Sequence, residues 1–422
     1  MGAATFVAWW LIGTYFRLAP VALAIQLARV CLMPVEARLR QADVDQAARI
    51  AAAYHVGLSP VPTESPRASW QALAQRIPEL RVLSSDAALQ DVRDDIPFVY
   101  QDASADYLQE FKRRYHLEKI VAQSDNEYES MLKLGAWVGT RWDHGSDLLP
   151  NDHNVCNPSA VIENGSRGAT YWCEIAARTL VHAASALGWP ARLITASRDG
   201  YTWEHAVAEL WSNRFDKWFV IDADFNMVYE DSTSRVPLSA FELHTTGEQL
   251  QRSGRLVLRS IAPPKKGLRF RSLIPFYAYV HVDMRNDWCT RALPRGSPAG
   301  GDLATWWTAR PSVGPILTAK VRVDDHARFD WPLNTVALYA LNAERIDGER
   351  VLVKVGLAGY SPVFARFELS IDGRSWQPVE GSTESVIVTP ATHSIQGRIV
   401  TRSGDEGPVS ELKLSLVKAL QP

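Results

Sequence analysis

The sequence predicts an α+β protein in which helices come first, an antiparallel sheet follows, and an all-β region comes last. Before residue 190, several stretches have the 3.6-residue apolar spacing of amphipathic helices. After Pro190, short segments rich in β-branched and aromatic residues are separated by turn signals, and from about Asp324 apolar and polar residues alternate. Strands that follow the helices, rather than alternating with them, indicate an antiparallel sheet covered by helices.

Composition is that of an ordinary globular protein. The 422 residues suffice for two or three domains, with 46% apolar and 22% charged side chains. The net charge of -2 comes from 45 basic and 47 acidic residues, and no run of Lys or Arg occurs. We therefore expect no nucleic-acid partner. The four cysteines are too few and too scattered for a disulfide framework; they are Cys31, Cys156, Cys173 and Cys289.

No motif has the spacing of metal ligands, so we expect neither a metal nor a cofactor. The nearest approach is "NDHNVCN", with Asp152, His153 and Cys156. We interpret this stretch as a polar loop.

Residues 1–33 form an apolar N-terminal segment. "MGAATFVAWWLIGTYF" precedes Arg17, and "LAPVALAIQLA" follows it. A membrane helix needs about 20 uninterrupted apolar residues, whereas a charge followed by an apolar run is the order found in an export signal. We expect membrane association through an anchor, or export, and thus a location in the cell envelope. A helix packed on the body of a cytoplasmic protein is the alternative.

Residues 34–104 are predicted to be a helical N-terminal region. The stretch 34–60 is predicted to be a helix, because Pro34 is at its start and Gly57 is near its end. Proline is common at the first position of a helix and glycine just after its last. A Pro-rich connector, "LSPVPTESPRA", follows it. Two further amphipathic helices, "DASADYLQEFKRRYHLEKIV" and "DNEYESMLKLGAWVGTRW", open the next domain.

We assign these two helices and the strands after Pro190 to one domain, residues 105–244. The expected strands are "ARLITAS", "EHAVAELW" and "KWFVIDADF". Residues 245–323, which contain "APPKKG" and "RGSPAGGD", are expected to be a connecting region.

Residues 324–422 are predicted to form a β-sandwich of the immunoglobulin or fibronectin type. The stretch "HSIQGRIVTRSGDEGPVSELKLSLV" reads as two strands joined by a glycine-containing turn. In "PVFARFELSIDGRSW" the alternation assigns one face to Val363, Ala365, Phe367, Leu369 and Ile371.

One cysteine has a position that favours chemistry. Cys173 opens an Ala-rich helical pattern in "GATYWCEIAARTLVHAASALGWPARLIT", which stops at Gly188–Trp189–Pro190. The N-terminus of a helix favours the thiolate, the nucleophilic form of cysteine. A free cysteine can also be a small buried hydrophobe, so the assignment depends on finding a base and a group that orients it.

His205 and Asp222 are the candidates for these two roles. His182 follows Cys173 by nine positions on the same helix, which turns it to the opposite side at roughly 100° per residue. His205 lies in one predicted strand and Asp222 in the next, so a pairing of the two strands brings imidazole and carboxylate together. The order is then nucleophile, base and orienting acid.

These blocks resemble the transglutaminase-like superfamily of papain-type cysteine enzymes. Its pattern is a cysteine opening a helix, an "alGiPAR" strand entry, a "HAxxEvw" strand and a "W…vD" strand. In this sequence the four parts, in the same order, are Cys173, Leu187–Arg192, His205–Trp211 and Trp218–Asp222. The resemblance covers about residues 105–235. It implies a papain-like core of helices packed on an antiparallel sheet, with Cys173 as nucleophile, His205 as base and Asp222 as orienting acid.

The departures from this pattern favour the bacterial members of the superfamily. Glu174 follows the cysteine where the animal transamidating enzymes have Trp, "VIDADFN" replaces the commoner Asp-Pro pair, and no acidic loop suggests calcium. We therefore expect a peptidase or amidase acting on a peptide or protein substrate, rather than a cross-linking enzyme. A catalytically inactive scaffold or binding module is the alternative. The sequence does not specify the substrate, the acyl acceptor or the oligomeric state.

Other residues near these motifs are weaker candidates. An indole N–H of Trp142 or Trp172 could supply the second donor of an oxyanion hole, beside the backbone N–H of Cys173. Glu209 shares the predicted face of His205, although an ion pair with an Arg is the simpler role. His144 and His153 are expected in loops, where either could contact substrate.

Overall fold

A mixed helix and antiparallel-sheet architecture is present in the computed structural model. The structure describes residues 49–85, 92, 96, 98–147, 157–198, 204–288, 305–308, 321–323 and 325–417. The predictions for residues 1–33 and for the loop with Asp152, His153 and Cys156 lie outside these residues. Within them, no helix has the length and hydropathy needed to cross a membrane. Contacts join Ile50–Pro422 into one compact unit.

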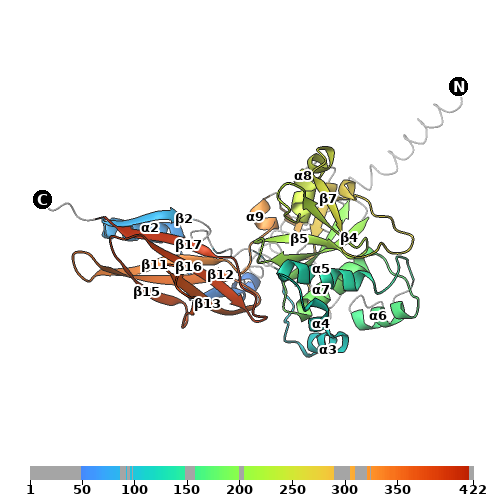
Figure 1. Ribbon diagram of the computed structural model, residues 1–422, viewed down its shortest axis with the longest axis horizontal. Helices are drawn as coiled ribbons and strands as arrows, with labels where there is room; N and C mark the ends of the chain where they lie inside the picture. The colour runs from blue at the N-terminus through green and yellow to red at the C-terminus, as the bar shows by residue number, and fades with distance from the viewer. Residues whose placement is uncertain are drawn as a thin grey trace, which may run out of the picture. The chain divides into compact units, whose positions relative to one another are not determined.

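The central element is an eight-stranded sheet with the order β10-β9-β8-β3-β4-β5-β6-β7. Its pairs are antiparallel except for β9 with β10. The predicted strands after Pro190 are its central members β3, β4 and β5. Figure 1 labels β4 and β5. The strands are β3 (Ala191–Ser197), β4 (His205–Ser212), β5 (Lys217–Asp222), β6 (Met227–Asp231), β7 (Leu256–Ser260), β8 (Tyr279–Val282), β9 (Thr305–Thr308) and β10 (Val321–Arg322).

Helices cover both faces of this sheet because β4 alternates between two cores. Ala206, Ala208 and Leu210 belong to one core, whereas Val207 and Trp211 belong to the other. The first core is closed by α3 (Asp106–Tyr115), α4 (Leu117–Val121), α5 (Glu127–Gly139), α6 (Pro158–Ser166) and α7 (Cys173–Ala186). The second is closed by α8 (Ala240–Arg252), η2 (Ile274–Ala278) and α9 (His326–Phe329).

The segment predicted to connect two domains, residues 245–323, contributes to this sheet instead. Its strands β7 and β8 pair with β6 and β3, and Tyr277 is completely buried in the second core. The segment was predicted to be a connection because of its proline- and glycine-rich stretches. These stretches lie between the strands, which are too short to be recognised from the local sequence.

The last part of the chain forms two antiparallel sheets whose side chains share one hydrophobic core. In one sheet, β12 (Val351–Tyr360) pairs with β11 (Val336–Arg345), β15 (Thr383–Val388) and β1 (His55–Gly57). The other has the order β14-β13-β16-β17-β2. Its strands are β14 (Gln377–Pro378), β13 (Phe364–Ile371), β16 (His393–Thr401), β17 (Ser410–Leu416) and β2 (Leu80–Ser85).

Two details differ from the predicted pattern in this region. A register shift in β13 between Phe364 and Arg366 turns Phe364 toward the core, while Ala365 is exposed. The predicted helical region 34–104 supplies β1, α2 (Pro66–Arg76) and β2 to the C-terminal sheets. Trp70 of α2 is buried there and donates its indole N–H to a backbone carbonyl of β11 over 2.7 Å.

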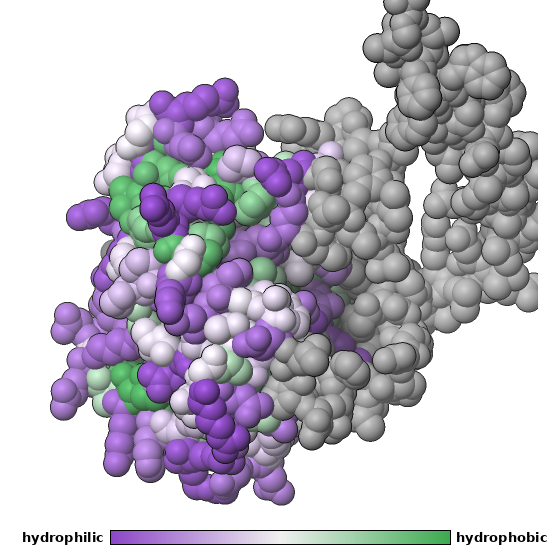
Figure 2. Space-filling model, turned by 90° about the vertical axis from the view of Figure 1, so that its right-hand side faces the viewer, coloured by the Kyte–Doolittle hydropathy of each residue, from purple (hydrophilic) through white to green (hydrophobic). Residues whose placement is uncertain are grey.

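The surface seen from the right-hand side of Figure 1 is mostly hydrophilic over the described residues, and its hydrophobic residues gather in separate patches (Figure 2). It shows no single continuous apolar area in that view.

Candidate active site

Cys173 is the first residue of α7, and its thiol is free and half-buried. Trp172 precedes it in an extended conformation and gives the helix no side-chain cap. The first backbone N–H groups of a helix have no partner within it, and together with the helix dipole they favour negative charge. Glu174 in the same turn is bonded to Arg178 over 2.8 Å, which offsets its charge. The thiol therefore lies beside backbone N–H groups that have no partner within the helix.

His205 and Asp222 meet because β4 and β5 are antiparallel neighbours. Ala208 lies opposite Ile221, which places Val207 opposite Asp222, and His205 is the next residue on the face of Val207. Nε2 of His205 lies 2.7 Å from Oδ2 of Asp222, and the two side chains are 3% and 0% exposed. This bond leaves Nδ1 as the ring nitrogen available to another group.

Cys173 is the other partner of His205. Burial lowers the pKa of His205, whereas Asp222 and then Cys173 raise it, so the thiol lies close enough to the imidazole to act on its charge. The raising effects are the larger, so the pKa of His205 lies well above its ordinary value. The structure thus brings Cys173, His205 and Asp222 together, with the imidazole between a sulfur and a carboxylate.

The loop after β5 holds this arrangement in place. Oδ1 of Asp222 accepts hydrogen bonds from the backbone N–H groups of Asp224 (3.1 Å) and Phe225 (2.9 Å). The ring of Phe225 meets the imidazole of His205 edge-on at 5.5 Å, and the ring of Phe276 is tilted against it at 6.3 Å. These contacts exclude water from the His205–Asp222 pair, which strengthens its electrostatic interaction.

A second buried carboxylate follows two residues later. Oδ2 of Asp224 lies 2.7 Å from Nδ1 of His144, and Oδ1 lies 3.2 Å from the ammonium of Lys265. Burial raises the pKa of Asp224, but His144 and Lys265 outweigh it, so the pKa of Asp224 is lowered. Burial is also the main cause of the lowered pKa of Lys265. Sequence reasoning missed Asp224 and Lys265; the available signal was the spacing of the two Asp residues in "VIDADF".

Trp142 lies beside this second cluster. Its ring faces the ammonium of Lys265 at 5.1 Å and meets Tyr171, two residues before Cys173, at 5.7 Å. Its buried indole N–H makes no hydrogen bond within the described part of the chain. Trp172 is partly buried and packs against the first core.

Glu209 is not at the reacting end of the sheet. It lies four residues along β4 from His205, roughly 13 Å away at the rise of a strand. Its carboxylate is completely buried, pairs with Arg192 over 2.6 Å and accepts the backbone N–H of Ala240 over 2.6 Å. Arg192 in turn bonds Asp330 over 2.6 Å. Glu209 therefore forms the ion pair with an Arg that we expected as its simpler role.

His182 is also far from the chemistry. It is buried against Tyr107 and Phe111, and burial, with a smaller effect of Arg178, lowers its pKa to about 4. It therefore stays neutral inside the first core.

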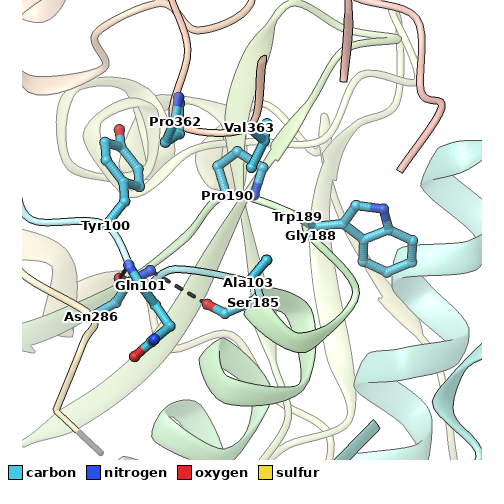
Figure 3. Close-up of a pocket in the computed structure, with 10 residues that line it drawn as sticks. All are labelled: Tyr100, Gln101, Ala103, Ser185, Gly188, Trp189, Pro190, Asn286, Pro362 and Val363. Carbon is cyan, nitrogen blue, oxygen red and sulfur yellow. Dashed lines mark hydrogen bonds between the residues drawn. The ribbon is translucent and has the colours of Figure 1, made fainter. Parts of the chain in front are cut away.

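A small pocket lies at the opposite end of α7 from Cys173 (Figure 3). Asn286 donates to Ser185 over 3.5 Å and accepts the backbone N–H of Gln101 over 2.5 Å at this pocket. Its volume of about 10 Å³ for a water-sized molecule is the space of roughly one water. Ser185 is twelve residues from Cys173, roughly 18 Å along the helix, so this pocket does not serve the nucleophile.

Among the described residues, no group of three or more His, Cys, Asp or Glu side chains has the arrangement of a metal site.

No family model and no curated protein sequence matches the chain. A candidate cysteine protease from Cytophaga hutchinsonii is 21% identical, with a TM-score of 0.24, over 32% of this chain and 43% of that one. Red sea bream transglutaminase is 11% identical, with a TM-score of 0.23, over 85% of this chain and 64% of that one. The chain thus spans less than half of the first structure and under two thirds of the second. TM-scores of this size do not establish a shared fold.

Proposed function

We propose that this protein is a cysteine-dependent acyl-transfer enzyme that acts on amide bonds through Cys173, His205 and Asp222. The observation that supports it most is the buried contact of 2.7 Å between His205 and Asp222, with Cys173 as the second partner of the same imidazole. A thiolate at a helix N-terminus, an imidazolium beside it and a carboxylate that orients the ring are the parts of an activated cysteine nucleophile.

The geometry supports a reaction in two steps. The thiolate of Cys173 attacks an amide carbonyl, and His205 donates its proton to the leaving amine. The resulting thioester is then resolved by water, in a peptidase or amidase, or by a second amine. The backbone N–H of Cys173 and the unpaired indole N–H of Trp142 are the donors we propose for the developing oxyanion.

We further propose that residues 105–331 have a transglutaminase-like, papain-like architecture. Supporting it are a cysteine at the start of a helix, an antiparallel sheet behind that helix, and His and Asp on neighbouring strands. The two C-terminal sheets around one core support the proposal of an immunoglobulin- or fibronectin-like sandwich. The proposed location in the cell envelope, through residues 1–33, rests on the sequence alone.

The test is the pH dependence of alkylation at Cys173 by iodoacetamide. The tryptic peptide "GATYWCEIAAR" reports Cys173 by mass spectrometry, and the other three cysteines lie in different peptides and serve as references. In the wild type we expect rapid alkylation at pH 6, where an ordinary cysteine with a pKa of about 8.5 is almost unreactive. His205→Ala should abolish this difference.

A matched control is His393→Gln, because His393 also contacts a carboxylate, Asp372, over 2.9 Å, but within the C-terminal sheets. It should alkylate like the wild type. If Cys173 reacts no faster than the reference cysteines, or reacts equally in His205→Ala, the proposal is wrong and the scaffold alternative gains support. If the proposal passes this test, digestion of a peptide library and identification of the new termini distinguish hydrolysis from transamidation.

A further inference from the structure

A second histidine–carboxylate pair lies next to the proposed triad. Nδ1 of His144 contacts Asp224 over 2.7 Å, and the His144 side chain is 38% exposed whereas that of Asp224 is 1% exposed. The other ring nitrogen, Nε2, makes no hydrogen bond within the part of the chain that the structure describes. The buried carboxylate therefore orients an imidazole whose free nitrogen is open to solvent or to a bound molecule.

The backbone places His144 beside the segment that carries the nucleophile. His144 forms a parallel bridge with Tyr171, two residues before Cys173. The N–H of Tyr171 donates to Asp143, and the N–H of Gly145 donates to Tyr171, both over 3.2 Å. His144 is thus held to the approach of α7 by hydrogen bonds on each side.

The two histidines are linked through one short loop. Asp222 bonds His205, Asp224 bonds His144, and the backbone N–H of Asp224 donates to Asp222 over 3.1 Å. A displacement of this loop would move both imidazoles. The sequence "DAD" therefore organises two imidazoles for one nucleophile.

We propose that His144 is a second acid–base residue of this site, which accepts the proton of the acyl acceptor when the thioester at Cys173 is resolved. This inference rests on the proposed function. In that step the acceptor's lone pair forms the new C–O or C–N bond while its proton passes to Nε2 of His144. The C–S bond breaks, and its electron pair returns to Sγ of Cys173 as a thiolate. His144 then releases the proton to solvent, and His205 takes up a proton from solvent to replace the one it gave to the leaving amine.

The two carboxylates differ in a way that suits this division of roles. Among the described residues, His205 is the cationic side chain paired with Asp222, and the pKa of His205 is held well above its ordinary value, so His205 holds the proton that the leaving amine needs. Asp224 is already paired with Lys265 at 3.2 Å, which offsets part of the negative charge that acts on His144. The carboxylate of Asp224 is thus shared between His144 and Lys265, and it orients the His144 ring as Asp222 orients that of His205.

The titratable groups around His144 come from four segments. Lys265 and Asp224 approach it from the loops after β7 and β5, and Tyr171 pairs with it along the backbone. Asp143 and Asp147 lie on its own segment, where Asp143 accepts the N–H of Lys266 and Asp147 bonds Thr170. A pH profile must be compared between variants, because any of these groups can contribute to it.

The experiment uses p-nitrophenyl acetate as an acyl donor with the full chain. A burst of p-nitrophenolate measures acylation of Cys173, and the steady rate that follows measures resolution by water. For His144→Gln we expect an unchanged burst and a steady rate lower by about a hundredfold, the lower range of general base catalysis. The pH dependence of the steady rate should lose the inflection that the wild type shows. Hydroxylamine, which attacks thioesters without a base, should restore turnover.

His393→Gln is again the matched control and should show the wild-type burst and steady rate. The inference is overturned if His144→Gln keeps the wild-type steady rate and pH profile, if hydroxylamine does not rescue it, or if its burst is lost together with its steady rate. The absence of a burst in the wild type would instead overturn the proposed function, and this inference with it. Acetylated Cys173, identified in the peptide, distinguishes the two failures.

Discussion

Replacing Asp222 with asparagine removes one buried charge and leaves a side chain of almost the same shape. The amide oxygen can still accept the backbone N–H groups of Asp224 and Phe225, which the carboxylate accepts over 3.1 and 2.9 Å. The amide nitrogen then faces Nε2 of His205, where it can donate only to an unprotonated nitrogen. The variant therefore disfavours the imidazolium without opening a cavity.

The magnitude follows from the geometry of the pair. With the nitrogen and oxygen 2.7 Å apart, the centres of the two charges are about 4 Å apart. At an effective dielectric constant of about 20 such charges interact by about 4 kcal/mol, roughly a thousandfold in an equilibrium constant at 1.36 kcal/mol per factor of ten. Burial already lowers the pKa of His205. Without the negative charge of Asp222, the imidazole should therefore be neutral at neutral pH.

The assay is alkylation of Cys173 at pH 6 and at pH 9. We expect Asp222→Asn to react about 100- to 1000-fold more slowly than the wild type at pH 6, from the loss of an interaction of about 4 kcal/mol. At pH 9 any cysteine is largely ionised, so the two proteins should differ by only about threefold. Asp372→Asn, which removes the carboxylate partner of His393, is the matched control. Equal rates for Asp222→Asn and the wild type at pH 6 would refute the electrostatic reasoning.

Three further predictions concern the framework. Gly139→Ala places a Cβ 1.6 Å from Oδ1 of Asn226 and should lower the free energy of unfolding by about 3 kcal/mol. Gly348→Ala, which has open space around its Cβ, is the control and should change this free energy little. Equal urea midpoints for the two variants would contradict the prediction. Trp70→Ala should cost about 3–5 kcal/mol in urea unfolding of the C-terminal sheets, and a smaller loss would mean that α2 is not part of their core. The raised pKa of His205 stabilises the folded state below about pH 6.5, and this stabilisation is lost as the pH rises through the folded-state pKa. The free energy of unfolding should therefore fall on the alkaline side, and it should fall less in His205→Gln.

The sequence contains the local information for the proposed triad. Alternation assigned His205 and Asp222 to strands, and a helix pattern beginning at Cys173 assigned the nucleophile to its N-terminus; the structure places them so. Alternation ends with β5, however, and Asp224 lies in the turn beyond it. Its partners His144 and Lys265 come from distant segments, and no periodicity relates positions in separate loops.

The same limit explains the domain boundaries. β1 has three residues and pairs with β12, and β2 pairs with β17, each across a separation of roughly 300 residues. Such pairings depend on the completed tertiary structure and leave no signal within a window of ten or fifteen residues. The strand pattern of β17, which buries every second residue, was readable because it needs only its own sequence.

The contribution of α2 and β2 to the C-terminal sheets has a consequence for synthesis on the ribosome. The apolar side chains Trp70, Leu73 and Leu80 emerge early, but the strands that cover them begin at Val336. At the usual rate of translation, roughly 260 further residues take about 13–50 s. During that interval these side chains lack the strands that cover them in the folded protein, so the nascent chain must be shielded by a chaperone or by transient contacts until the last strands are made.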